Sequence, residues 1–171
     1  LTLYKTIVLP HFMYCPTILY LLCQTDMESL QKMQNRGMRI ILQCSRYTRI
    51  SDMRRVLEWL DVSDIIKLQT LILVHKLINN IGPEYLNKSI QNMKAKRSYN
   101  TRQKGNLYLT SKTKQSSINS LFYKGIRLYN TLPESIKSQP TFKKFKRQVR
   151  ELLYNKSFEE IVARFCFIQW N

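Results

Sequence analysis

The stretch from Ile65 to Ile78 most constrains how this 171-residue chain folds, because it is apolar on nearly every helical face. A helix with no polar side has to be surrounded by protein. Ser63 is expected to cap its start, and Gly82-Pro83 supplies a stop signal beyond its end. Lys67 and Lys76 interrupt the stretch, which is also shorter than the ~20 apolar residues that a membrane span needs. We therefore expect a central core helix and no membrane span.

Charge divides the chain on the two sides of this helix. Residues 1–87 carry 10 Lys/Arg and 7 Asp/Glu, whereas residues 88–156 carry 17 Lys/Arg against only Glu134 and Glu151. A segment with a net charge of +15 is drawn to polyanions, either nucleic acid or acidic membrane surfaces. The first part has the composition of a folding unit, and the second has that of a surface for a polyanion.

Helical spacing recurs on both sides of the central stretch. In the predicted helix from Met27 to about Cys44, one face carries Leu30, Met33, Gly37, Ile41 and Cys44. Another helix covers Ser120–Leu132, with inward positions at Leu121, Phe122, Ile126, Tyr129 and Leu132. After Thr141, a further stripe comprises Phe142, Phe145, Val149 and Leu152. A last short helix is expected over 158–165.

Two segments leave alternatives open. Phe12 to Cys23 is apolar and suits either core or a membrane-surface segment, and its length and lack of charge favour core. The basic stretch within 87–117 forms either a hairpin, joining Tyr99–Gln103 to Leu107–Thr110, or an unstructured arm. The apolar tail from Phe165 to Trp170 either folds back onto the core or is an aggregation-prone end.

The predicted fold class is mainly α: a thumb-like helical bundle with a basic loop or short β-hairpin and C-terminal helices. Residues 1–86 form the helical core, residues 87–117 the basic linker or arm, and residues 118–171 a basic helical segment. The chain opens without a signal-peptide pattern and as if inside a helix. We expect the end piece of a longer intracellular protein, nuclear or cytoplasmic rather than secreted.

Catalytic and metal-binding patterns are missing from the sequence. No two of the four cysteines form a Cys-x-x-Cys pair, and the two histidines complete no zinc spacing, so buried free thiols are the simpler interpretation. Asp61 and Asp64 lie one helical turn apart and could hold Mg²⁺, but their place beside a helix start favours capping. We expect no enzyme, no cofactor and no metal.

Cations and aromatic residues alternate through the basic part in a way that suits nucleic acid. Lys and Arg neutralise phosphates, and aromatic rings stack on unpaired bases. Tyr99, between Arg97 and Arg102, is the best stacking candidate, whereas Phe122 and Tyr129 are expected in the core. Lys32, Arg36 and Arg39 form a second basic stripe at steps of four and three. Such a stripe is also typical of an ordinary solvated surface.

Five blocks in order resemble the end of a reverse transcriptase from non-LTR retrotransposons of the jockey/CR1-like kind. They are Leu3-Tyr4-Lys5 with Leu9-Pro10-His11 and Tyr14-Cys15; Leu30 to Arg36 with Arg39-Ile40-Ile41; Tyr99 to Arg102; Leu128 to Pro133; and Phe142 to Lys146. The resemblance covers residues 3 to about 150. It implies the thumb and the region after it, which contact template and primer.

The resemblance does not extend to catalysis. The family synthesises DNA on RNA with two magnesium ions held by palm aspartates, and this chain has no Asp-Asp pair. A palm and fingers portion would be a missing upstream partner.

These observations lead to one hypothesis with two rivals. The first is a non-catalytic fragment that binds RNA or RNA–DNA template-primer through phosphates. Its predicted contacts are Lys32, Arg36, Arg39, Arg97, Tyr99, Arg102, Lys104, Lys143, Lys146 and Arg147. The rivals are a truncated mobile-element relic with no biochemical function, and a membrane-surface or protein-docking module.

Overall fold

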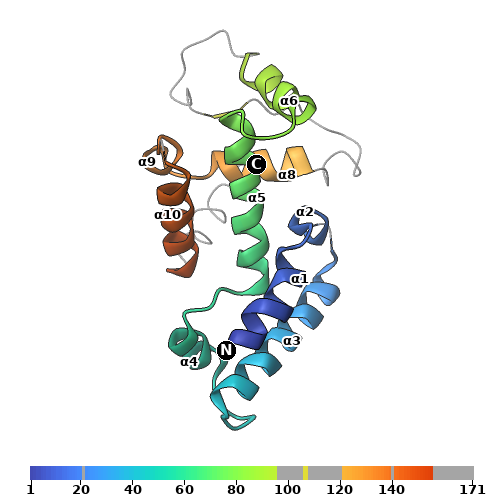
Figure 1. Ribbon diagram of the computed structural model, residues 1–171, viewed down its shortest axis with the longest axis vertical. Coiled ribbons are helices and arrows are strands. Elements are labelled where there is room, and N and C mark those ends of the chain that lie inside the picture. Colours follow the sequence, from blue (N-terminus) through green and yellow to red (C-terminus); the bar gives the residue numbers. More distant parts are fainter. Residues whose placement is uncertain (21, 96–105, 108–120, 140, 156–171) are drawn as a thin grey trace, which may run out of the picture. The chain divides into compact units, whose positions relative to one another are not determined.

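The computed structural model describes residues 1–20, 22–95, 106–107, 121–139 and 141–155, and within them every regular element is a helix (Figure 1). The elements in chain order are the π-helix η1 (Tyr4–Val8), α1 (Leu9–Met13), α2 (Pro16–Leu19), α3 (Gln24–Leu42), α4 (Ile50–Leu57), α5 (Val62–Ile78), α6 (Glu84–Ala95), α8 (Leu121–Asn130), α9 (Glu134–Lys137) and α10 (Phe142–Tyr154). The predicted mainly α class is confirmed. The predicted hairpin, the helix over 158–165 and the apolar tail lie outside the described residues.

The chain forms two compact units, residues 1–69 and 70–171, and the division falls inside α5. The sequence instead suggested segments ending at 86 and 117, and α6 runs across the first of those boundaries. The three-segment organisation stays a prediction. Each unit is described separately below.

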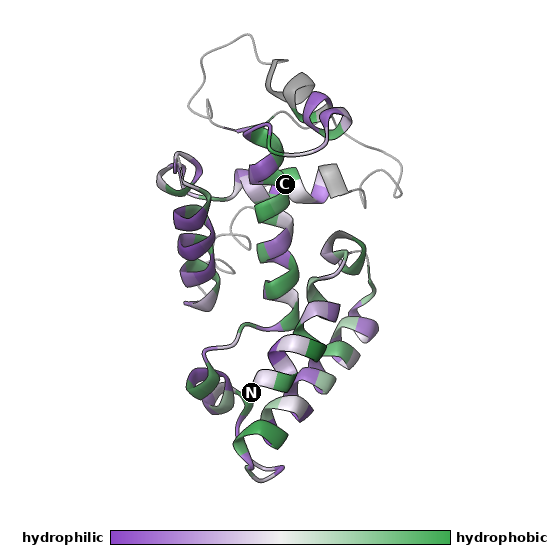
Figure 2. Cartoon of the chain, in the orientation of Figure 1, coloured by the Kyte–Doolittle hydropathy of each residue, from purple (hydrophilic) through white to green (hydrophobic). Residues whose placement is uncertain are grey.

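Helix α5 is the buried helix that its composition predicts. Its buried side chains come from successive turns and from all sides, and the fully buried ones include Val62, Ile66, Leu71 and Leu77. Figure 2 shows hydrophobic residues along the length of α5, in contrast with the largely hydrophilic α10. The predicted Ser63 cap is wrong, because the helix begins at Val62 and Asp61 occupies the capping position. The Asp61 carbonyl accepts the first intrahelical bond, from the Ile65 N–H at 2.9 Å.

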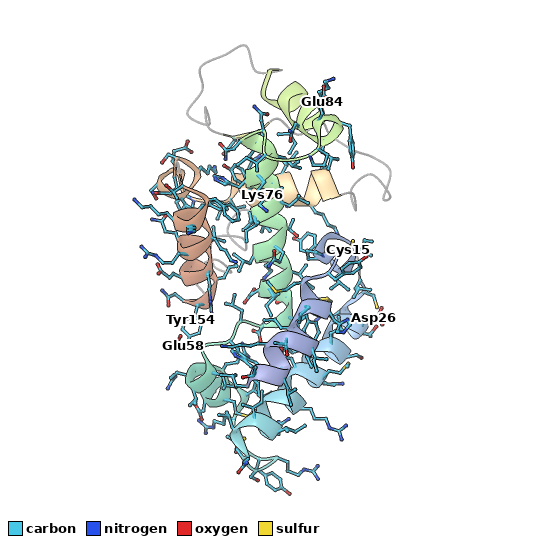
Figure 3. The ribbon with its side chains drawn as sticks, viewed as in Figure 1. Cys15, Asp26, Glu58, Lys76, Glu84 and Tyr154 are labelled. Atoms are coloured by element: carbon cyan, nitrogen blue, oxygen red, sulfur yellow. The ribbon has the colours of Figure 1, made fainter. Side chains whose placement is uncertain are left out.

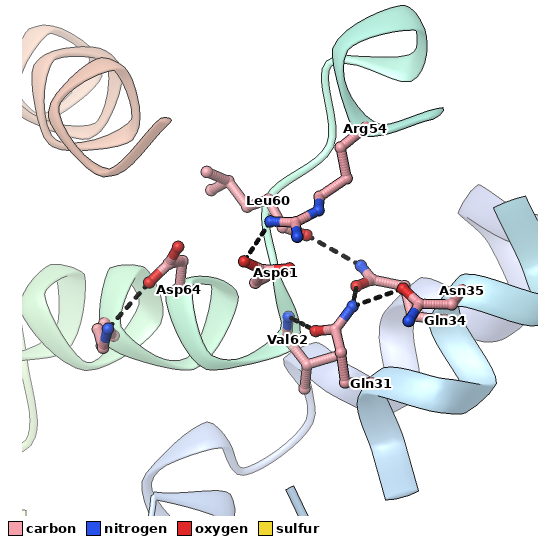
Figure 4. Close-up of polar contacts among 9 residues, drawn as sticks. Gln31, Gln34, Asn35, Arg54, Leu60, Asp61, Val62 and Asp64 are labelled. Carbon is pink, nitrogen blue, oxygen red and sulfur yellow. Dashed lines mark hydrogen bonds and ion pairs between the residues drawn. The ribbon is translucent and has the colours of Figure 1, made fainter. Parts of the chain in front are cut away.

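In the first unit, a network of amide side chains joins α3 to the start of α5 (Figure 4). Gln34 Nε2 donates to the Leu60 carbonyl at 3.0 Å, and Gln31 Oε1 accepts from the Val62 N–H at 2.9 Å. Gln31 Nε2 donates to Gln34 Oε1 at 2.8 Å and to Asn35 Oδ1 at 2.9 Å. The network thus provides backbone partners on both sides of Asp61, which the start of a buried helix requires.

This network places polar residues on the buried side of α3. The buried residues are Gln34, Asn35 and Met38. Of the predicted apolar face, Met33 is 65% exposed, and the other four members are half-buried: Leu30, Gly37, Ile41 and Cys44. Gln34 can be buried because both ends of its amide are hydrogen-bonded, which removes most of the cost of taking it out of water. On the same unit, the Tyr4 ring stacks on Trp59 with 4.0 Å between ring centroids.

The apolar segment before α3 is core only in part. Phe12 is buried, but Tyr14 is 80% and Ile18 is 61% exposed. The expectation that Phe12 to Cys23 forms core is therefore confirmed at Phe12 and wrong at Tyr14 and Ile18. Cys15 and Cys23 are exposed free thiols, which also contradicts the expectation of buried cysteines.

In the second unit, aromatic rings from α8 and α10 pack against His75 of α5. The His75 and Phe145 rings stack with centroids 3.8 Å apart and planes within 6°, and the Tyr129 ring lies 6.4 Å from His75. Asn79 Nδ2 lies 3.2 Å from His75 Nε2 and donates to the His75 carbonyl at 2.9 Å. Burial lowers the pKa of His75 and raises the pKa of Tyr129 to about 12, with Glu134 adding to the latter.

The burial of α5 predicts a large cost for truncating one of its fully buried residues. Leu71→Ala should lower the free energy of unfolding by about 2–5 kcal/mol, because it removes apolar packing and leaves a cavity. The measurement is urea unfolding followed by circular dichroism. Ile81→Ala, at an exposed position of the same unit, should change it by less than about 0.5 kcal/mol. Equal losses in the two variants would contradict the central role of α5.

The lowered pKa of His75 predicts a stability that declines in acid. Below its ordinary pKa of about 6.5 the unfolded chain takes up a proton that the folded chain refuses, so this contribution is complete above pH 6.5 and is lost as the pH falls below it. Because carboxylates also titrate, the test compares wild type with His75→Phe, which keeps a ring against Phe145. The variant should lose less stability between pH 7.5 and pH 5 than wild type. An identical decline would contradict the assignment.

Candidate nucleic-acid interface

Helix α10 carries a row of cations on its exposed side. Lys143, Lys146, Arg147 and Arg150 follow one another at steps of three, one and three, and all four are exposed. At 100° per residue these positions share an arc of about 100°. Figure 3 shows the side chains of this helix, whose C-terminal end is marked by Tyr154. The row contains the three residues of α10 that the sequence singled out as phosphate contacts.

The buried side of α10 fixes the direction of this row. Phe145, Val149 and Leu153 are buried at steps of four, while Phe142 and Leu152 are half-buried, so the predicted apolar stripe is largely confirmed. Phe145 stacks on His75, and the Lys76 ammonium lies 5.0 Å from the centroid of the Phe142 ring. Rotating α10 to bury a cation would break these contacts. The row is therefore held toward solvent by the packing beneath it.

The three cations of the stripe on α3, in the first unit, are less uniformly exposed. Lys32 and Arg36 are exposed, and neither makes an ion pair with any residue that the structure describes. Arg39 is half-buried, and its Nε is buried with no hydrogen-bond partner in the described part of the chain. Lys32 and Arg36 are available to a ligand, and Arg39 is only partly so.

Four predicted contacts, Arg97, Tyr99, Arg102 and Lys104, lie outside the described residues. Two residues between the undescribed stretches, Asn106 and Leu107, are described and are firmly anchored. Asn130 uses one side-chain amide for both backbone groups of Leu107: its Oδ1 accepts from the N–H and its Nδ2 donates to the carbonyl, each at 2.9 Å.

Lys137 strengthens the same anchor. Its Nζ donates to Asn106 Oδ1 at 2.7 Å and to the Asn130 carbonyl at 3.1 Å, and it lies 5.9 Å from the Tyr129 ring centroid. Burial lowers the pKa of Lys137, and the nearby Glu134 carboxylate opposes this shift. Lys137 is thus committed to the fold.

The structure also reveals cations that were not singled out from the sequence. The connection between α3 and α4 carries Arg46, Tyr47 and Arg49, all exposed, with the Arg46 guanidinium carbon 5.7 Å from the Tyr47 ring centroid. The sequence pattern that could have identified them is an aromatic residue between two arginines in a stretch with few acidic residues. Tyr99 shows the same pattern.

The two aspartates considered for Mg²⁺ each have a cationic partner. Asp61 pairs with Arg54, and Asp64 pairs with Lys67 at 3.0 Å. Within the described ranges, no group of three or more His, Cys, Asp or Glu residues could hold a metal ion. Both carboxylates therefore form ion pairs at or near the start of α5.

No helix in the described part of the chain is long and apolar enough to cross a membrane. Comparisons with protein-family models, with curated proteins and with solved structures gave no match.

The anchor at Leu107 predicts a stability loss on removal of one amide. Asn130→Ala would leave the N–H and carbonyl of a buried residue without their partner, which should cost about 1–3 kcal/mol in the free energy of unfolding. Urea unfolding measures the loss, and Asn155→Ala, at an exposed position after α10, is the control. A loss no larger than that of the control would show that water replaces the amide without cost.

Proposed function

We propose that this chain is a non-catalytic nucleic-acid-binding module derived from the thumb and post-thumb region of a non-LTR retrotransposon reverse transcriptase. It binds RNA or RNA–DNA template-primer through phosphate contacts. The observation that carries the proposal is the row of exposed cations on α10, which buried aromatic contacts hold toward solvent. The family origin rests on the five sequence blocks, and the helical fold agrees with what they imply.

Phosphate chemistry suits this row better than a specific small anion. Four cations within eight residues of one helix place positive charge along about 10 Å of axis, which a polymer of phosphates can contact at several points. Each contact releases condensed counterions, so affinity depends steeply on salt. Lys32 and Arg36 supply further exposed charge in the first unit, and the chain as a whole carries a net charge of +17.

The relic hypothesis makes a different prediction. A chain without a retained role has no need of a cooperative core, whereas the satisfied amide network and the anchor at Leu107 are typical of a defined native state. A single sigmoidal unfolding transition, seen equally by circular dichroism and by tryptophan fluorescence, would argue against the relic. The docking alternative draws on Phe12–Cys23, in which Tyr14 and Ile18 are exposed, and on Phe165–Trp170, which lies outside the described residues. Binding to neutral vesicles would support it.

The main test removes two cations from the row on α10. Lys143→Ala/Lys146→Ala should weaken binding to a labelled RNA–DNA primer-template. It should also make the slope of log affinity against log salt shallower, by roughly 0.7–0.9 for each phosphate that the variant no longer neutralises. Fluorescence anisotropy across a salt series measures both quantities. Lys32→Ala/Arg36→Ala tests the stripe on α3 with the same two measurements.

The matched control is Lys5→Ala/Lys88→Ala, which removes the same charge at exposed positions outside both rows. It should leave the slope close to that of wild type. If the control and the α10 variant weaken binding equally, the attraction is that of any polycation, and the proposal fails. Circular dichroism of each variant checks that the helices are retained.

A further inference from the structure

The connection between α3 and α4 is an ordered turn with a tyrosine at its apex. Gln43 ends α3 in the left-handed conformation, with φ of 49°. The Thr48 N–H then donates to the Ser45 carbonyl at 3.1 Å, and the Tyr47 N–H donates to Ser45 Oγ at 3.3 Å. These bonds place Arg46 and Tyr47 at the two central positions of a β-turn.

The Tyr47 side chain is 85% exposed, although a tyrosine normally buries most of its ring. One contact orients it: the Arg46 guanidinium carbon lies 5.7 Å from the ring centroid, in the range of a cation–π interaction. The guanidinium covers part of one side of the ring, and the high exposure leaves a broad apolar face open to solvent. A flat aromatic ligand could stack there.

The surroundings of the turn are strongly basic. Residues 32–55 hold seven Lys/Arg against a single acid, Asp52. Arg54 pairs with Asp61, but Arg46, Arg49 and Arg55 are exposed. On α3, the cations Lys32 and Arg36 precede the turn. An exposed ring among cations is the combination with which proteins stack a base while neutralising its phosphates.

We propose that the Arg46–Tyr47 turn is a stacking site for an unpaired base. This inference rests on the proposed nucleic-acid binding and deepens it, because it names the class of nucleic acid. Within a duplex both faces of every internal base are covered by neighbouring base pairs. Tyr47 therefore selects a strand with unpaired bases, such as a single-stranded template beyond the end of a duplex.

The test separates base stacking from phosphate attraction by using two strands of equal length and charge. One labelled single-stranded RNA carries bases throughout, and the other is abasic at every internal position. Tyr47→Ala in the full chain should weaken binding to the strand with bases by about 5- to 150-fold, the range for removal of one stacked base. It should leave binding to the abasic strand unchanged, and the salt slope should stay the same for both.

Two further variants complete the design. Tyr47→Phe keeps the ring and should bind like wild type. Tyr14→Ala removes another highly exposed tyrosine of the same unit, at a position without neighbouring arginines, and should have no effect on either strand. Because both tyrosines are exposed, neither change removes core packing, and circular dichroism confirms the helices.

The outcomes distinguish the two proposals. If wild type binds with a steep salt slope but Tyr47→Ala weakens both strands equally or neither, the turn is only a surface cation–π pair. The stacking site is then refuted while phosphate binding stands. If wild type binds the RNA–DNA primer-template but neither of these strands, the stacking site is refuted while the proposed function stands. If it binds none of the three, the proposed function is refuted and the stacking site with it. A loss confined to the strand with bases supports both.

Discussion

The requirement to cover α5 on every side governs the rest of the fold. A helix with apolar residues all round has no face that can be left to water, so each unit must supply partners for its own portion. In the first unit these include the amides of α3 at the helix start. In the second unit they include the rings of Phe145 and Tyr129, which contact His75. Because these partners must face α5, the remaining sides of the covering helices face solvent.

The direction of the cations is a consequence of this covering. On α10, Phe145, Val149 and Leu153 must face inward, so the lysines and arginines between them have only the outer arc. On α3, the inward place is taken by Gln34 and Asn35, which leaves Lys32 and Arg36 on the surface. An exposed basic face thus arises from the packing of the core beneath it.

The parts of the fold that the sequence predicted are those governed by apolar periodicity within one helix. The continuous apolar run identified α5, and the steps of three and four identified α8 and α10. The burial of Gln34 was not predicted because Gln31 and Gln34 are polar, and the backbone groups that they bond lie 31 and 26 residues further along the chain. The cap at Asp61 was missed because Ser63, two residues on, has an equally suitable side chain.

The candidate site was likewise predictable where apolar periodicity determines it and not where contacts of the folded chain do. The α10 row follows from periodicity, since its positions are fixed relative to Phe145. The exposure of Tyr47 does not, because a single aromatic residue in a short connection can be buried or exposed with the same local sequence. What decides the matter is the turn at Ser45 and the guanidinium of Arg46, which become visible only with the chain folded. The anchor between Asn130 and Leu107 is likewise an interaction across 23 residues that no local pattern encodes.

The row on α10 carries a cost that links stability to binding. Lys143 and Arg147, like Lys146 and Arg150, are like charges at i,i+4, an arrangement that destabilises a helix by about 0.2–0.5 kcal/mol per pair. The ion pair between Arg147 and Glu151, at 3.7 Å and exposed, offsets little of this. The helix is therefore held by Phe145, Val149 and Leu153 against its own surface charge. Added salt screens this repulsion and favours the free helix, yet it weakens attraction to phosphates, so the two effects of salt have opposite signs. A bound polyanion relieves the repulsion directly, and the helix is then most stable when it is bound.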